Sequence, residues 1–181
     1  MELVLVNPQI PHNTGCAARL AAALQLPLHL VEPLGFSLED KYLKRAGLDY
    51  WPNVALHVHA DWEAASEALG AGSERPLAER LKLFSARGGS SLFEVEFAAD
   101  DVLIFGSETE GLPAALLEEH EDKRVYIPVD PAVRSLNLAN VICLAAYTAL
   151  HSSGSPLPKN DGAHVPNTGC GSISPIERVQ S

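Results

Sequence analysis

Short apolar runs alternate with helix-forming segments along most of the chain, and this alternation constrains the fold more than any other feature. Strands are expected over 2–6, 28–33, 53–59, 80–86, 101–106 and 124–129. Helices are expected over 13–26, 40–47, 61–70 and 113–120, with a closing helix after Ser135. Apolar strands separated by helices are typical of a mainly parallel sheet with helices on both faces. We therefore predict one α/β domain over residues 1–151.

The remaining segment, residues 152–181, has a different composition. It reads "SSGSPLPKNDGAHVPNTGCGSISPIERVQS", is rich in Ser, Gly and Pro, and shows neither helical nor strand periodicity. Such a segment buries too little apolar surface to offset the entropy of ordering. We expect a mostly disordered tail.

Several classes of protein are disfavoured by the composition. No apolar run reaches the roughly 18 to 20 residues of a membrane span, and "MELVLVNP" lacks the basic start of a signal peptide. The three cysteines, Cys16, Cys143 and Cys170, are far apart and form no CxxC pair. Neither a disulfide framework nor a zinc site is expected, and a reducing cytoplasm fits best.

Two further kinds of site lack support. His57 and His59 alternate on one predicted strand and share a face, but two histidines without a third ligand rarely bind a metal. Neither GxSxG nor GxGxxG occurs, which disfavours a hydrolase elbow and a standard dinucleotide loop. We therefore assign no metal.

Four polar loops follow strand ends. "NPQIPHNTG" follows the first strand, "SARGG" follows Phe84, "GSETEGLP" follows Phe105 and "PVDPAVRSLN" follows Ile127. Each loop alone is what any α/β protein needs for turning. Because ligands bind beyond the carboxyl ends of parallel strands, the convergence of four such loops predicts a site at this edge.

Three of these stretches also carry a family resemblance. "NPQIPHNTGCAAR", "FGSETEGLP" and "IPVDPAVRSLNLANVICLAAY" resemble, in order and spacing, the three motifs of the SPOUT class of RNA methyltransferases. Within that class the chain is most similar to the small tRNA wobble-nucleotide 2′-O-ribose methyltransferases, over about residues 2–151. Two positions depart from the motifs: Cys16 stands where Asn is common, and Ala139 where Ser is common.

The resemblance implies a fold and an activity. The fold would be a mostly parallel six-stranded sheet with a C-terminal trefoil knot, in an obligate homodimer whose protomers both contribute to each site. The cofactor would be S-adenosylmethionine, and the substrate the ribose 2′-hydroxyl of the wobble nucleotide, C or U, in a tRNA anticodon loop. Two alternatives stay open: another tRNA or ribosomal RNA ribose, or a non-catalytic RNA-binding adaptor on the same fold.

The resemblance also assigns cofactor-binding residues. The backbone of Phe84, Gly106 and Ile127 would cup the adenine, although core packing explains the two apolar side chains equally well. Ser135 and Asn137 would meet the methionine end at the start of the closing helix, or either would simply cap that helix.

Asn140 is the remaining cofactor candidate. It lies three residues after Asn137 and is expected on the same helical face. Two amides on one face of a core helix would need hydrogen-bond partners.

Ser135 and Asn137 are also candidate catalytic residues by resemblance, together with Glu108 and Arg19. Glu108 could orient an arginine or cap the helix that begins near Pro113, and Glu110 is an equal candidate for that cap.

Arg19 resembles the residue that activates the ribose hydroxyl in the wider class. A guanidinium does not readily lose its proton. As a cation, Arg19 could instead hold a phosphate or stabilise the forming alkoxide. The alternative is a surface arginine on a helix of Ala and Leu.

A nucleic-acid substrate is unexpected for the overall charge. The net charge is −10, so RNA must meet a local basic patch rather than a positive mean field. Lys41, Lys44 and Arg45 fall on one helical face and are the clearest cluster, to which we add Arg87 and Arg134 as phosphate contacts. Alternatively, the three cations lie on a solvent-exposed helical face and pair with neighbouring acidic side chains, which explains the cluster equally well.

Overall fold

A computed structural model describes residues 1–38, 53–71, 73–159 and 177–178 of the chain. The predicted basic cluster Lys41, Lys44 and Arg45 lies outside the described residues.

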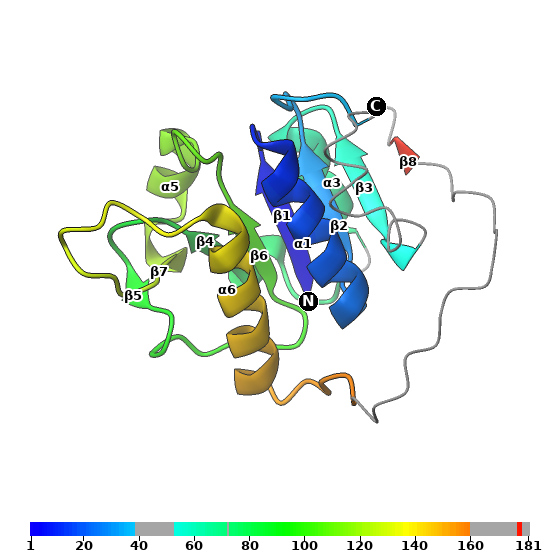
Figure 1. The fold of residues 1–181 in the computed structure, drawn as a ribbon. Coiled ribbons are helices and arrows are strands. Elements are labelled where there is room, and N and C mark those ends of the chain that lie inside the picture. Colours follow the sequence, from blue (N-terminus) through cyan, green and yellow to red (C-terminus); the bar gives the residue numbers. More distant parts are fainter. Residues whose placement is uncertain (39–52, 72, 160–176, 179–181) are drawn as a thin grey trace.

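One sheet organises the molecule, and all of its strands pair in parallel. Its order is β5-β7-β4-β6-β1-β2-β3-β8 (Figure 1). The strands are β1 (Glu2–Val6), β2 (Leu28–Val31), β3 (Leu56–His59), β4 (Leu81–Phe84), β5 (Ser90–Ser91), β6 (Val102–Phe105), β7 (Arg124–Tyr126) and β8 (Glu177–Arg178). The mainly parallel α/β fold is confirmed. The expected count of six is wrong, because the two-residue segments β5 and β8 add a strand at each edge.

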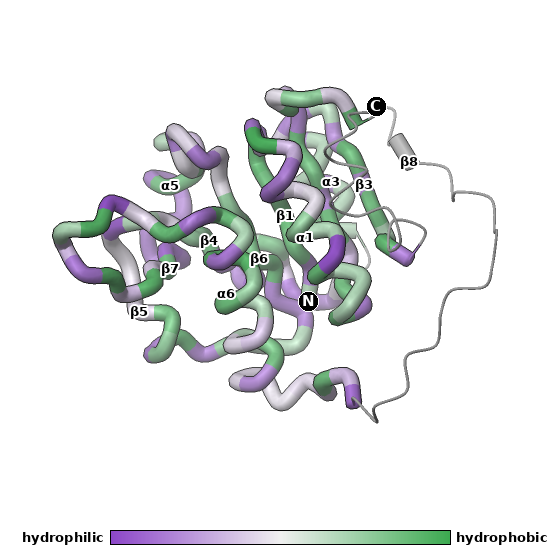
Figure 2. Tube along the Cα trace, viewed as in Figure 1, coloured by the Kyte–Doolittle hydropathy of each residue, from purple (hydrophilic) through white to green (hydrophobic). Residues whose placement is uncertain are grey.

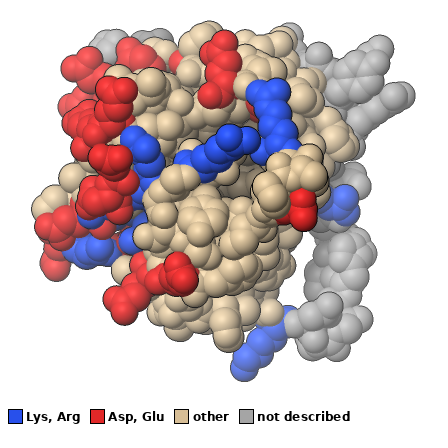
Figure 3. All heavy atoms as spheres, turned by 90° about the vertical axis from the view of Figure 1, so that its left-hand side faces the viewer, with Lys and Arg blue, Asp and Glu red and all other residues tan. Residues whose placement is uncertain are grey.

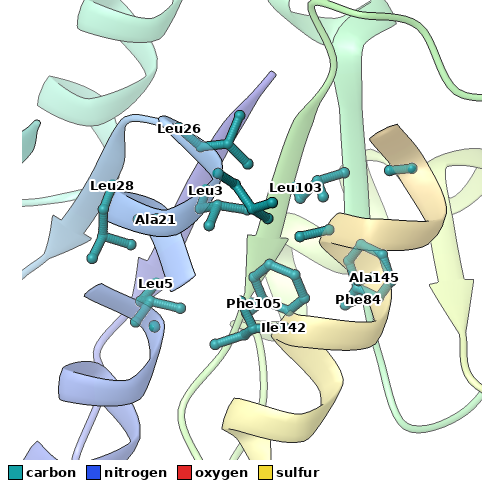
Figure 4. Packing of buried hydrophobic residues seen from close by; sticks show 14 of the residues in the cluster. Leu3, Leu5, Ala21, Leu26, Leu28, Phe84, Leu103, Phe105, Ile142 and Ala145 are labelled. Carbon is teal, nitrogen blue, oxygen red and sulfur yellow. The ribbon is translucent and has the colours of Figure 1, made fainter. Parts of the chain in front are cut away.

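Two helical layers cover the sheet. The helices are α1 (Pro11–Leu24), α3 (Trp62–Gly70), α4 (Leu77–Arg80), α5 (Ala114–Glu119), the 3₁₀ turn η2 (Glu121–Lys123) and α6 (Leu138–Ser152). α1 and α6 pack on one face, whose buried cluster includes Leu3, Phe105 and Ile142 (Figure 4). α3 and α5 lie over the other face, where Val4 and Ile104 are buried.

The alternation of side chains along each strand produces these two cores. In β1, Leu3 and Leu5 face α1 and α6, whereas Val4 and Val6 face the opposite layer. Figure 2 shows the central strands β1 and β6 as mostly hydrophobic, as burial on both faces requires. Truncating a fully buried residue such as Ile142 to alanine would lower the free energy of unfolding by about 2–5 kcal/mol.

The starts of two helices differ from expectation. α1 begins at Pro11, whose fixed φ suits a first helical turn, so the helix starts two residues before the expected residue 13 and Asn13 lies inside it. α6 begins at Leu138 and is capped by Asn137, whose side chain accepts a hydrogen bond from the backbone N–H of Ala139 at 2.9 Å. The capping role is therefore confirmed for Asn137, and Ser135 precedes the helix.

A polar cluster is buried on the face that α3 covers. His29 bridges Glu2 and His59, with Nε2 3.1 Å from a Glu2 carboxylate oxygen and Nδ1 2.9 Å from His59 Nε2. The His57 ring stacks on His29 at 4.6 Å, and Arg80 donates to the other Glu2 oxygen at 2.7 Å. His59 is fully buried, and its Nδ1 has no hydrogen-bond partner among the described residues.

This burial sets the protonation of the cluster. Burial, followed by the charges of His29 and His57, lowers the pKa of His59 from 6.5 to about 4. Burial opposes ionisation of Glu2, but the hydrogen bonds and charges of His29 and Arg80 still lower the pKa of Glu2. His59 is therefore neutral at physiological pH while Glu2 is charged.

Candidate active site

A cavity of about 500 Å³ opens beyond the carboxyl ends of β4, β6 and β7. All four polar loops contribute to its wall, as the sequence predicts, and Figure 3 shows positively charged side chains bordering a hollow on this side of the molecule. The lining includes Ile10, Asn13, Phe84, Ser85, Gly106, Glu108, Thr109, Ile127, Arg134, Ser135, Asn137 and Val141.

Part of the cavity wall is aromatic. Phe84 and Phe105, at the ends of β4 and β6, stack with ring centroids 4.7 Å apart. Phe84 is 6% exposed, so core packing does explain its side chain.

Gly106 makes the turn after β6 possible. A Cβ at this position would lie 2.0 Å from the carbonyl carbon of Gly111 and 2.2 Å from the nitrogen of Leu112. The loop folds back because Ser107 and Gly111 exchange two backbone hydrogen bonds of 3.0 Å. The need for glycine therefore comes from this backbone crossing.

Glu108 is held by three donors from the first loop and α1. Its carboxylate accepts from the backbone N–H groups of Gln9 at 2.8 Å and Ile10 at 3.2 Å, and from Asn13 Nδ2 at 2.9 Å. The carboxylate thus sits at the N-terminus of α1, where negative charge is favoured. Neither Glu108 nor Glu110 caps α5, which has Pro113 at its N-cap and no side-chain cap bond.

Asn13 joins Glu108 to the last motif. Its Oδ1 accepts a hydrogen bond from Asn137 Nδ2 at 3.1 Å, while its Nδ2 donates to Glu108. The Asn13 side chain is only 2% exposed, and both its oxygen and its nitrogen form hydrogen bonds to these partners. The sequence prediction missed it as a site residue. The available signal was an amide inside an otherwise Ala- and Leu-rich helix.

A second, outer connection runs parallel to the first. Arg134 Nη2 donates to the carbonyl oxygen of Thr109 at 3.3 Å. The Thr109 hydroxyl in turn donates to Gln9 Oε1 at 2.7 Å. The same three loops are thus tied twice, by a buried amide inside and by exposed side chains outside.

The predicted site residues divide into two groups. The structure brings Phe84, Gly106, Glu108, Ile127, Ser135 and Asn137 together in the cavity wall. The other group, Arg19 on α1, Arg87 after β4 and Asn140 on α6, is exposed and does not line the cavity of this chain.

The burial expected for the Asn140 amide is not found, and its cofactor contact stays a prediction. Asn137 precedes α6 as its cap, and Asn140 lies three residues later inside the helix. Asn140 is exposed and needs no buried partner.

In the described part of the chain, no group of three or more His, Cys, Asp or Glu is arranged to hold a metal ion. No helix in the same residues combines the length and apolarity needed to cross a membrane. Cys16 and Cys143 are free thiols.

Comparison with known proteins places the chain in a family. Residues 1–147 match the SpoU rRNA Methylase family, and the protein belongs to it. It is 42% identical over 154 residues to a tRNA (cytidine(34)-2′-O)-methyltransferase of Polaromonas sp., covering 84% of this chain and 91% of the relative. The corresponding enzyme of Escherichia coli is 39% identical over 157 residues, covering 86% and 96%.

Solved structures agree with this placement. One, described as giving structural insights into the 2-OH methylation of C/U34 on tRNA, has a TM-score of 0.76 and 48% identity, covering 83% of this chain and 94% of that chain. The methyltransferase AviRb of Streptomyces viridochromogenes, solved with AdoMet bound, shares the fold at a TM-score of 0.68 and 24% identity, covering 83% and 57%.

Proposed function

We propose that this protein transfers a methyl group from S-adenosylmethionine to the ribose 2′-hydroxyl of the wobble nucleotide, C or U, in a tRNA anticodon loop. The observation that carries the proposal is the cavity in which three motif loops meet at the Glu108–Asn13–Asn137 hydrogen bonds. Relatives named for this reaction share 39–42% identity over nearly their whole length.

The cavity suits the cofactor in size and chemistry. Its volume of about 500 Å³ is within the range of small-molecule sites, and its wall combines apolar side chains with Phe84, Gly106 and Ile127, whose backbone groups we propose as the adenine contacts. Backbone donors and acceptors can read the adenine edge without adding charge. Ser135 and Asn137 lie just before α6, where polar groups can meet the methionine end.

The bound cofactor would supply an electrophilic methyl on its sulfonium. The residues of the chain then have to hold the ribose oxygen near that methyl and prevent orientations of the ribose from which the methyl cannot be transferred. Glu108, fixed by its three donors, keeps the first and second motif loops at a constant separation. Arg19 as a cation would stabilise negative charge as the hydroxyl loses its proton.

The role of Arg19 requires a second subunit. It is exposed on α1 and lies outside the cavity lining of its own chain. α1 packs beside α6, whose outer surface carries the exposed apolar side chains of Leu144 (38%) and Tyr147 (45%). We propose that this surface is the homodimer interface, which would bring Arg19 of one subunit to the other's cavity.

The tRNA would meet a limited basic surface on an acidic protein. With a net charge of −10, binding depends on local cations, for which we propose Arg87 together with Lys41, Lys44 and Arg45. Affinity should therefore fall steeply with salt. The proposal places the enzyme in the cytoplasm, with tRNA.

Methyl transfer to unmodified total tRNA tests the proposal. Labelled S-adenosylmethionine would be supplied, and the modified nucleotide located by nuclease digestion and mass spectrometry. We expect a 2′-O-methyl at the wobble position. Label at another ribose would reassign the target. If the protein neither binds the cofactor nor transfers label, it is instead a non-catalytic RNA-binding adaptor.

A further inference from the structure

Arg134 is the one cation in the described wall of the cavity. The other charged residues that line it are the carboxylates of Glu108 and Glu110. The lining residues of this cavity therefore carry two negative charges and one positive charge. In a chain of net charge −10, that guanidinium is placed where charge complementarity with RNA is most needed.

The hydrogen bonding of Arg134 leaves most of its donors available. Among the described residues its guanidinium makes one contact, a 3.3 Å bond from Nη2 to the carbonyl oxygen of Thr109. A guanidinium has five N–H donors in a planar fork that matches two phosphate oxygens. The residue is exposed, so these remaining donors face solvent at the mouth of the cavity.

The Thr109 contact fixes where the guanidinium lies. Thr109 is itself anchored, because its hydroxyl donates to Gln9 Oε1 at 2.7 Å. Arg134 also directly precedes Ser135, which lines the cavity. The cation is thus held in the cavity wall next to Ser135 before any substrate arrives, which reduces the entropy lost on binding.

We propose that Arg134 is a positioning residue that binds the phosphate adjoining the target ribose. This inference rests on the proposed function and names a contact for it. A ribose 2′-hydroxyl and its 3′-phosphate belong to the same nucleotide, so a bidentate grip on the phosphate restricts where the hydroxyl can lie. Restricting that oxygen matters because small misplacements in methyl transfer are costly.

A purely structural role for Arg134 predicts a different result. If the guanidinium only tied Thr109 to the last loop, its removal would loosen the cavity and weaken cofactor binding. A phosphate contact instead leaves cofactor affinity unchanged and changes the dependence of tRNA binding on salt.

The experiment compares wild type with Arg134→Ala and Arg134→Lys, and uses Lys159→Gln as the matched control. Lys159 is exposed beyond α6, and its replacement removes the same positive charge away from the cavity. Three quantities are measured: cofactor affinity by calorimetry, tRNA affinity at several salt concentrations by filter binding, and steady-state methyl transfer.

For Arg134→Ala we expect unchanged cofactor affinity, roughly tenfold weaker tRNA binding, and a salt slope smaller by about 0.7, the value for one phosphate on a single strand. Arg134→Lys should restore the salt slope but not the full kcat, because an ammonium lacks the planar fork. Lys159→Gln should match wild type.

Two outcomes would overturn the inference. One is a loss of cofactor affinity in Arg134→Ala as large as its loss of tRNA affinity. The other is tRNA binding by that variant with the salt slope of wild type. Filter binding measures tRNA affinity independently of turnover. If wild-type protein binds tRNA without methylating it, the proposed reaction is refuted, but the phosphate contact of Arg134 can still be tested by comparing the salt slopes of wild type and Arg134→Ala. Wild-type protein that does not bind tRNA would refute both.

Discussion

The side-chain amide of Asn137 donates a hydrogen bond to Asn13 Oδ1 at 3.1 Å, across 124 positions of the sequence. Asn13 passes the connection on to Glu108, and Asn137 also caps α6. One buried amide therefore links three loops around the cavity.

Replacing Asn13 by alanine should damage both stability and turnover. Asn137 would lose its acceptor and Glu108 one of its three donors, so we expect the free energy of unfolding to fall by about 1–3 kcal/mol. Displaced loops should lower methyl transfer by on the order of a hundredfold. Urea unfolding and labelled methyl transfer measure the two effects.

The control for Asn13→Ala is Ser66→Ala, which removes a hydroxyl that donates to the Glu63 carbonyl oxygen within α3. This variant should resemble wild type in both assays. Normal turnover in Asn13→Ala would show that the connection between the loops is dispensable.

Gly106→Ala should prevent the loop after β6 from closing. The added Cβ would lie within 2.2 Å of backbone atoms of Gly111 and Leu112, which cannot yield as a flexible side chain could. We expect weaker cofactor binding by calorimetry and a lower unfolding temperature.

Gly70→Ala is the matched glycine substitution, since nothing lies within 4 Å of a Cβ at the end of α3. It should leave both measurements near wild type. Equal cofactor affinity and unfolding temperature in the two variants would show that the close approach of Gly111 and Leu112 does not require glycine at position 106.

Mixing two inactive variants tests whether Arg19 acts across subunits. Arg19→Ala and Glu108→Ala chains should each be inactive alone. If each site uses Arg19 from one subunit and Glu108 from the other, every mixed dimer contains one intact site, and random mixing should restore about a quarter of wild-type activity.

Co-refolding the two variants and assaying methyl transfer measures this restoration. Light scattering on the same sample checks that dimers form. If activity stays absent although mixed dimers are present, Arg19 acts within its own subunit or not at all.

Stability should fall in mild acid because of His59. Its pKa in the folded protein is about 4 against an ordinary 6.5, so between these values the unfolded chain binds a proton that the folded chain does not. The contribution of His59 to the free energy of unfolding is then fully present above pH 6.5 and is lost as the pH falls toward 4. Urea midpoints across this range measure the slope.

His59→Gln should flatten that slope, because the group that titrates differently in the two states is gone. His12→Gln removes an exposed histidine outside the cluster and should keep it. Retention of the wild-type pH dependence by His59→Gln would show that His59 is not the source of the slope.

Much of the fold could be predicted because strand propensity and burial are local properties of the sequence. Runs such as Val102–Phe105 are apolar on both faces and can only be central strands. The strand Ser90–Ser91 carries no such signal, since it forms by pairing with β7 at the sheet edge. Its existence depends on tertiary structure alone.

The site was predicted where loops follow strands and missed where contacts are distant. Asn13 looks locally like a helix cap, but its partners lie 95 and 124 residues away and leave no local pattern. Asn140 departs from expectation for a different reason. Helical periodicity places it in the first turn of the closing helix, but it does not show that this position is exposed.

The tie between Asn13 and Asn137 also has a consequence for the order of events during synthesis. The first two motif loops leave the ribosome well before the third, yet the wall of the cavity is incomplete until α6 docks. A nascent chain should therefore be unable to retain cofactor until its closing helix has emerged. Cofactor retention would then report that translation of the domain is finished.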